Sequence, residues 1–131
     1  MVIDTSALVA ILLAEPEAAR MVAAIAAERV RLVGSATLVE ATAVMLGRKG
    51  ESGRVALDAL ISELEIEIVP FSPAAGKLAA DAYAESGRGV GQPAVLNYGD
   101  CLSYGVAIET GEPLLFKIHD LRSTDVVAVE Y

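Results

Sequence analysis

Residues 1–14 read MVIDTSALVAILLA, and this stretch indicates the fold most strongly. Its first three residues are apolar and two of them are β-branched, which is typical of a buried strand, while the apolar run over 7–14 is typical of a helix. Asp4 lies at the turn between them, where hydrophobic burial gives no reason for a charge. An ionised Asp is almost never fully buried unless it is paired. The partner of Asp4 is therefore the first question about function.

Short β-branched runs alternate with longer Ala- and Leu-rich runs along the whole chain. We expect helices over residues 7–14, 15–28, 36–46, 51–64, 73 to 84 or 85, and 100–110. We expect strands over residues 2–3, 31–34, 66–69, 114–116 and 125–129. Strands joined through helices need crossover connections. The pattern therefore predicts an α/β fold with a mainly parallel sheet covered on both faces.

Several residues are expected to mark the ends of these helices. Ser35 and Ser72 are expected N-caps, because their hydroxyls can accept a hydrogen bond from the first turn. Glycines at 47 and 50 are expected to close the helix over 36–46, and Gly111 the helix over 100–110.

Length, charge and cysteine content narrow the class of protein. The 131 residues suit a single domain, 1–131, which would bury roughly 65–70% of its unfolded surface. A lone cysteine, Cys101, fits a reducing compartment, so we expect the cytoplasm and neither a signal peptide nor a membrane span. The net charge of −8 excludes nucleic-acid binding by bulk attraction, so any polyanion must be held locally.

Three other carboxylates, Glu40, Asp100 and Asp120, also stand in apolar segments. Taken singly, Asp4 and Asp100 are candidate helix caps, and Asp120 is a candidate turn residue. Glu40 has no such explanation, because every other residue over 35–47 is uncharged. A helix that is apolar all round is buried, so a lone Glu inside it needs a partner.

The predicted topology brings these four acids together. Carboxyl ends of parallel strands meet at one edge of the sheet, where such folds bind ligands. Like charges about 4 Å apart repel by roughly 4 kcal/mol at an effective dielectric near 20, so a cluster of acids takes up protons or binds cations. Oxygen donors without grouped His and Cys favour Mg²⁺ or Mn²⁺ over zinc. Such a site suits phosphodiester hydrolysis by a metal-activated water.

Three stretches then match a known family in order and spacing. They read MVIDTSA over 1–7, NYGDCLSY over 97–104, and PLLFK over 113–117 followed by Asp120 and Asp125. They resemble the PIN-domain ribonucleases, and most closely the VapC-type toxins of toxin–antitoxin pairs. The resemblance spans the whole chain, and it implies a PIN-like three-layer α/β/α fold with a central sheet of four to five strands.

The resemblance also implies roles for individual residues. Asp4, Glu40 and Asp100 are the core acids that hold Mg²⁺ or Mn²⁺, and Asp120 is a fourth. A hydroxyl from Thr5 or Ser6 lies beside the metal-bound waters. Arg88 and Lys117 are expected to follow the RNA backbone.

The implied function is that of a metal-dependent endoribonuclease that acts as a toxin. Its implied partners are the RNA substrate, a cognate VapB-type antitoxin that blocks it, and a second copy in a homodimer. In many relatives a basic side chain of the antitoxin enters the acidic pocket, which suits a site that needs cations. A hydrophobic content of 54% is consistent with an apolar surface that a partner covers.

The chain also departs from the family pattern, which leaves an alternative. The closing stretch, KIHDL over 117–121, has Ile118 where relatives usually carry Gly and Leu121 where they carry Phe. A non-catalytic PIN-like module that binds RNA or protein is therefore the alternative function. A phosphoacceptor receiver domain has a similar size and sheet, but it needs an acid after the strand over 66–69, where this chain has Pro70.

Four further residues have two interpretations each. His119 is either a donor near the scissile phosphate or an exposed turn residue. Cys101 is expected to be a small core residue rather than a nucleophile, because no His base is placed to activate it. Tyr98 and Tyr104 could stack on a base, and for Tyr104 we expect packing.

Overall fold

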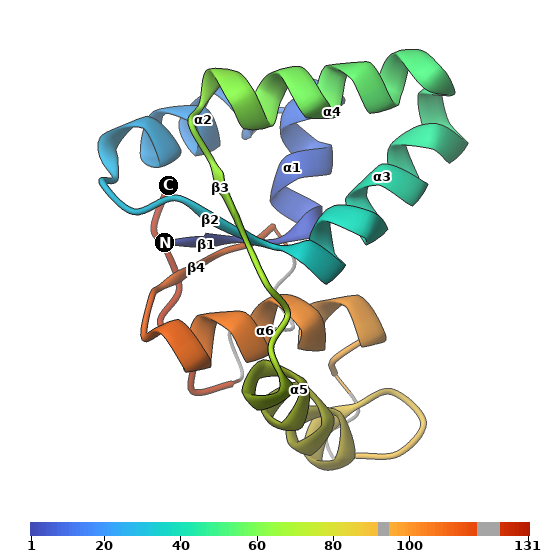
Figure 1. Ribbon diagram of the computed structural model, residues 1–131, viewed down its shortest axis with the longest axis vertical. Helices are drawn as coiled ribbons and strands as arrows, with labels where there is room; N and C mark the ends of the chain where they lie inside the picture. The colour runs from blue at the N-terminus through green and yellow to red at the C-terminus, as the bar shows by residue number, and fades with distance from the viewer. Residues whose placement is uncertain (92–94, 118–123) are drawn as a thin grey trace.

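A four-stranded parallel sheet forms the centre of the computed structural model, which describes residues 1–91, 95–117 and 124–131 (Figure 1). Its strands are β1 (Val2–Ile3), β2 (Leu32–Gly34), β3 (Glu67–Val69) and β4 (Leu114–Leu115). They lie in the order β3-β2-β1-β4, with every neighbouring pair parallel. Val2 is aligned with Leu32 on one side and with Leu114 on the other.

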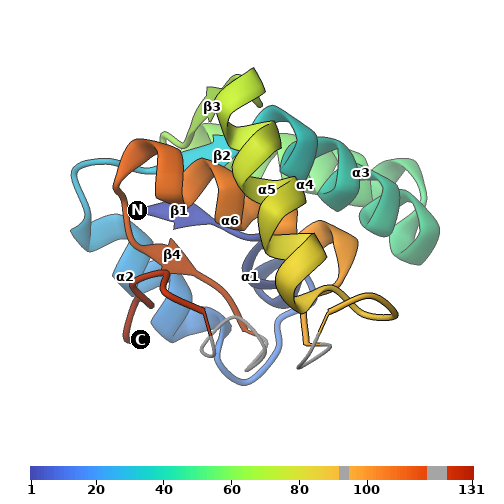
Figure 2. The ribbon, with the colours of Figure 1, turned by 90° about the horizontal axis from the view of Figure 1, so that it is seen from below.

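Six described helices enclose this sheet. They are α1 (Thr5–Leu12), α2 (Ala18–Ala27), α3 (Ser35–Lys49), α4 (Glu51–Glu63), α5 (Pro73–Ser86) and α6 (Tyr98–Thr110). Helices α1 to α4 lie on one face, whereas α6 lies on the other with α5 packed outside it (Figures 1 and 2). The three-layer α/β/α architecture and the parallel sheet are therefore confirmed. None of these helices, within the part of the chain that the structure describes, is long and apolar enough to cross a membrane.

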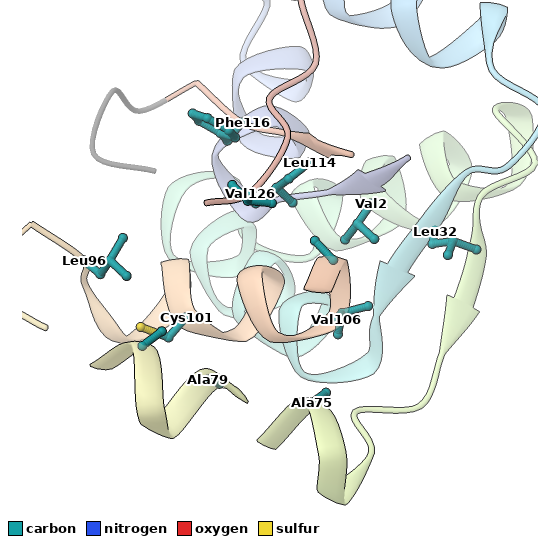
Figure 3. Close-up of a cluster of buried hydrophobic side chains, with 12 residues drawn as sticks. Val2, Leu32, Ala75, Ala79, Leu96, Cys101, Val106, Leu114, Phe116 and Val126 are labelled. Atoms are coloured by element: carbon teal, nitrogen blue, oxygen red, sulfur yellow. The ribbon is translucent and has the colours of Figure 1, made fainter. Parts of the chain in front are cut away.

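Alternate residues of each strand face opposite layers, so two apolar clusters form. Val2, Leu32 and Leu114 belong to the cluster that packs on α6 and α5 (Figure 3). Ile3 and Leu115 belong to the cluster on the side of α1 to α4. Both residues of β1 and of β4 are buried and apolar, as is usual inside a parallel sheet, whereas β3 at the sheet edge carries the exposed Glu67.

One of the two predicted serine N-caps is confirmed, and the other is wrong. Ser72 caps α5 by accepting a hydrogen bond from the Ala75 N–H at 3.0 Å. The prediction that Ser35 is an N-cap is wrong, because Gly34 takes that place and Ser35 is the first helical residue. The Ser35 hydroxyl instead accepts the Phe71 N–H at 3.0 Å, which ties α3 to the segment after β3.

Helix α3 also runs further than expected. Gly47 lies inside the helix, and the chain leaves it only at Gly50, whose φ of +62° suits a glycine. Arg48 and Lys49 occupy the last turn, where positive charge interacts favourably with the helix dipole.

The connection before α2 is longer than the sequence suggested. The helix begins at Ala18 rather than at Glu15. Ala14 has a positive φ of 52°, and the carboxylates of Glu15 and Glu17 both pair with the ammonium of Lys117. These interactions hold residues 13–17 as a turn.

The expected strand over 125–129 is reduced to a single parallel bridge between Leu114 and Ala128. The Leu114 N–H donates to the Val127 carbonyl at 2.8 Å, and the Val129 N–H donates to the Leu114 carbonyl at 3.0 Å. The segment therefore covers the β4 edge of the sheet without extending it.

Candidate active site

A pocket of about 170 Å³ lies where the start of α1, the middle of α3 and the start of α6 meet. Its lining comes from these three segments: Asp4, Thr5, Ser6, Val9, Glu40, Val44, Asn97, Gly99 and Asp100. Asp4 directly follows β1, so the pocket lies at the carboxyl edge of the parallel sheet. Three of the four predicted acids thus share one pocket, whereas Asp120 lies outside the described residues.

Asp4 is almost fully buried, with 3% of its surface exposed. Its Oδ2 accepts hydrogen bonds from the Ser6 N–H at 2.8 Å and the Ser6 hydroxyl at 2.5 Å. Its Oδ1 accepts a hydrogen bond from the Ser103 hydroxyl at 2.6 Å. Asp4 is therefore both the N-cap of α1 and a carboxylate aligned by donors on two elements.

Glu40 is half-buried, and it reaches the pocket from the second turn of α3. The Thr5 hydroxyl donates to its Oε2 at 2.6 Å. Burial raises the pKa of the Glu40 carboxyl, the Thr5 hydrogen bond opposes this shift, and the negative charge of Asp4 adds to it. The site therefore holds Glu40 at a position where its ionised form is disfavoured.

Asp100 is the third residue of α6 rather than the cap that begins it. Asn97 is the N-cap, and the two residues form a capping box: the Asp100 N–H donates to Asn97 Oδ1 at 2.9 Å, and the Asn97 N–H donates to Asp100 Oδ2 at 2.8 Å. Only 3% of Asp100 is exposed. The helix start thus fixes the position of this carboxylate.

Gly99 is a site residue that the sequence did not single out. A Cβ at this position would clash with the Glu40 carboxylate, so the absence of a side chain leaves room for that carboxylate in the pocket. The signal was present in the sequence, as a glycine directly before Asp100. Its meaning depended on knowing that α3 lies opposite.

Ser103 was also missed, although it touches Asp4 directly. The signal was a hydroxyl three residues after Asp100, on the buried face of the same helix. Nothing in the local sequence says that a residue 99 positions earlier is its partner.

The donors of the pocket match a hard cation in type. Carboxylate, hydroxyl and amide oxygens line it, and no Lys or Arg is among its described lining residues. Within residues 1–91, 95–117 and 124–131, however, no three His, Cys, Asp or Glu side chains lie close enough together to hold one ion. The three acids surround a shared pocket, without forming a closed set of ligands.

The two predicted basic residues do not line this pocket. Lys117 pairs through its ammonium with Glu15 and Glu17, the hydrogen bond to Glu15 being the main reason that its pKa is raised. Its main-chain N–H donates to the Ser6 hydroxyl at 3.0 Å, so Lys117 supports the site through its backbone. Arg88 is exposed on the loop after α5.

Cys101 is buried, and burial, followed by the charge of Asp100, raises the pKa of its thiol to about 11. It is therefore a core residue, as expected, and not a thiolate nucleophile. Tyr104 donates to Asp125 at 2.8 Å, and burial raises its pKa to about 12, so its hydroxyl is tethered. Tyr98 is 73% exposed. His119 lies outside the described residues.

A larger hollow of about 410 Å³ lies between α5 and α6, lined by apolar and aromatic side chains that include Phe71, Tyr83 and Tyr98. It contains no carboxylate. Volume alone therefore does not identify the candidate active site, because the carboxylates line the smaller pocket.

Comparison with known proteins identifies relatives of the whole chain. The PIN domain family matches residues 1–126. Ribonuclease VapC30 of Mycobacterium tuberculosis is 43% identical over 129 residues, which cover 98% of each chain. Ribonuclease VapC28 of the same organism is 44% identical over 126 residues, covering 96% of this chain and 95% of the relative.

Solved structures share the fold at much lower identity. The crystal structure of VapC20 of Mycobacterium tuberculosis, described as a sarcin–ricin loop cleaving toxin, aligns with a TM-score of 0.80 at 16% identity, over 99% of this chain and 98% of that one. VapBC2 from Rickettsia felis, bound to a promoter DNA fragment, aligns with a TM-score of 0.72 at 18% identity, over 98% and 96% of the two chains.

Proposed function

Because the chain belongs to the PIN-domain family and groups with its VapC ribonucleases, we propose that it is a metal-dependent endoribonuclease that acts as a toxin. The observation that carries this proposal is the convergence of Asp4, Glu40 and Asp100 on one pocket from three separate segments of the chain. The substrate class is RNA, and the reaction is hydrolysis of a phosphodiester bond.

The proposed metal is Mg²⁺ or Mn²⁺, held by Asp4, Glu40 and Asp100, with Asp120 as a fourth acid. Support comes from the carboxylate, hydroxyl and amide side chains in the pocket lining and from the raised pKa of Glu40, which reflects burial and the nearby charge of Asp4. A divalent ion in such a site supplies a water of lowered pKa and neutralises charge on the phosphate.

The residues of the chain prepare the site for that ion. Donors from Ser6 and Ser103 fix the position of the Asp4 carboxylate. The capping box does the same for Asp100. Thr5 orients Glu40. Little reorganisation is then needed when the cation binds, which is the usual advantage of a preorganised site.

Regulation by a VapB-type antitoxin is part of the proposal. Toxin–antitoxin complexes are among the proteins of similar fold, including one from Klebsiella pneumoniae with a TM-score of 0.72 at 18% identity over 99% of this chain and 97% of that one. A pocket that gathers three carboxylates suits a basic side chain of such a partner. We also propose a homodimer, which a mass measurement on the purified chain would check.

The rate of RNA cleavage, measured under three conditions, tests the metal mechanism. We expect cleavage with Mg²⁺, loss of cleavage with EDTA, and a loss of at least about 100-fold in the Asp4→Asn variant, because the variant removes a charged ligand from the site. The matched control is Asp58→Asn, an exposed aspartate of α4 that pairs with Arg54. It should cleave as the parent does.

The same assay distinguishes the alternative of a non-catalytic module. Cleavage that survives both EDTA and Asp4→Asn would contradict the metal mechanism. RNA that binds but stays intact across many substrates would indicate a binding module instead.

A further inference from the structure

We propose that Ser103 is a positioning residue for the metal site, which fixes Asp4 so that a single oxygen, Oδ1, is presented to the cation. This inference rests on the proposed metal-dependent function and specifies how one of its ligands is used. It concerns a residue of α6 that lies 99 positions from Asp4 in sequence.

The hydrogen bonds around Asp4 determine which oxygen remains available. A carboxylate offers about four lone-pair positions, two on each oxygen. Oδ2 already accepts two hydrogen bonds, from the Ser6 N–H and the Ser6 hydroxyl. Oδ1 accepts one, from Ser103. Within the described residues, the remaining position of Asp4 is therefore on Oδ1, which favours a ligand that binds through one oxygen.

The proton of Ser103 is directed at Asp4. Its Oγ lies 2.6 Å from Asp4 Oδ1 and 3.1 Å from the Asp100 carbonyl oxygen. One hydroxyl has one proton to donate, and hydrogen bonds to charged acceptors are shorter and stronger than those to neutral ones. The contact with Asp4 is therefore the dominant one. It also joins α6, which carries Asp100, directly to the first acid of the site.

Packing alone does not explain a serine here. Ser103 is fully buried, and the surrounding positions of α6 include the small apolar residues Cys101 and Ala107. Alanine is the better helix former and carries no polar group to satisfy. A buried hydroxyl at this position is accounted for by its bond to Asp4, because burial of an unpaired hydroxyl would be unfavourable.

A second support acts on Asp4 from the opposite direction. Ser6 is itself held by the Lys117 N–H at 3.0 Å, immediately after β4. Asp4 is thus held between the end of β4, through Ser6, and α6, through Ser103. Removing Ser103 leaves the Asp4 carboxylate held at Oδ2 only, so the position of Oδ1 is no longer fixed.

The test measures Mn²⁺ binding by titration calorimetry at 25 °C on the whole chain, without RNA. We expect Ser103→Ala to raise the Kd for Mn²⁺ about 10-fold, since residues that orient metal ligands typically contribute about 10- to 100-fold in affinity. A cysteine at this position keeps the volume but is a poor donor, so Ser103→Cys should show a similar loss. Circular dichroism in EDTA checks that each variant is folded.

The control is Thr110→Val, which removes a hydroxyl from the same helix. Among the described residues, the Thr110 hydroxyl donates to carbonyls of α6, those of Val106 and Ala107. Its removal should leave the Kd for Mn²⁺ unchanged. If Ser103 had a purely structural role, Ser103 variants that circular dichroism shows to be folded would also keep the Kd of the parent.

The outcomes separate this inference from the proposed function. A Kd equal to that of the parent in both folded Ser103 variants would overturn the positioning role, while the metal-dependent mechanism would stand. A parent chain that binds no Mn²⁺ would overturn both. A loss confined to the Ser103 variants would support both.

Discussion

Single residues decide how close the three acids come. Glu40 reaches the pocket only because the facing residue, Gly99, has no side chain. Asp4 keeps its orientation through hydroxyls on either side of it. At this scale the site depends as much on small residues as on the carboxylates, because small residues set the space and the direction in which the carboxylates act.

Gly99→Ala should reduce cleavage by about 10- to 100-fold with little change in stability. The new methyl group would displace the Glu40 carboxylate, and misplacement of a catalytic group by about 1 Å can cost on the order of 100-fold in rate. Rates of RNA cleavage and urea unfolding together measure the two effects.

Gly47→Ala is the matched control for this change. Gly47 also lies in a helix, but a Cβ there meets no atom within 4 Å. It should leave cleavage unchanged and stabilise the protein slightly, because alanine favours the helix. Equal activity of the two variants would rule out a spatial role for Gly99.

At the scale of secondary structure, the starts of α1 and α6 position two of the three acids. Asp4 caps α1, and Asp100 belongs to the capping box of α6. Polar side chains at helix starts satisfy backbone N–H groups, and this capping fixes part of their position. The folding of α1 and α6 therefore supplies part of the alignment of these two carboxylates, and for Asp4 the contact with Ser103 adds to it.

Asn97→Ala and Ser72→Ala should separate stability from activity. Both remove the N-cap of a helix, so each should lower the free energy of unfolding by about 1 kcal/mol. Only Asn97 lines the acidic pocket and pairs with Asp100, so only its substitution should slow RNA cleavage.

Urea unfolding and cleavage rates for the two variants provide the measurement. The comparison is informative because Ser72 caps α5, which contributes no lining residue to the pocket. Equal losses of activity would mean that stability alone controls the rate.

For the whole molecule, the acidic pocket is a local concentration of charge in a chain of net charge −8. This concentration of charge lowers the free energy of unfolding, because folding brings the Glu40 carboxylate close to Asp4 and removes that carboxylate from water. Binding of a cation or of a basic partner side chain would then stabilise the folded protein as well as complete the site.

The free energy of unfolding, measured as a function of pH in EDTA, shows how much the buried charge of Glu40 destabilises the protein. Burial and Asp4 raise the pKa of Glu40 above its usual 4.5, so the folded state binds the proton more tightly than the unfolded state. The contribution of Glu40 to stability is therefore most favourable below pH 4.5 and is lost as pH rises through the folded pKa. Glu40→Gln should remove this dependence and stabilise the chain at neutral pH.

Glu63→Gln, at an exposed position on α4, is the control and should leave the pH dependence unchanged. If Glu40→Gln destabilised the protein at neutral pH in EDTA, the raised pKa would be contradicted.

The sequence by itself determined the layers and the acids. Alternation of short apolar strands with helices indicates a parallel sheet, and a carboxylate without a capping role in an apolar helix, Glu40, indicates a partner elsewhere in the fold. The apolar pattern of a strand or helix, and a charge that interrupts it, can be recognised within one segment without knowledge of the rest of the fold. The helix boundaries were also close, except at the start of α2 and where Ser35 and Gly47 took other roles.

Only the tertiary structure decided which residues support the acids. Ser103 faces Asp4, Gly99 faces Glu40, and Ser35 binds Phe71 because layers distant in sequence pack against each other. The local sequence does not distinguish a serine or glycine that supports a functional site from one that does not. Its function depends on the group opposite it, and packing across the sheet determines that group.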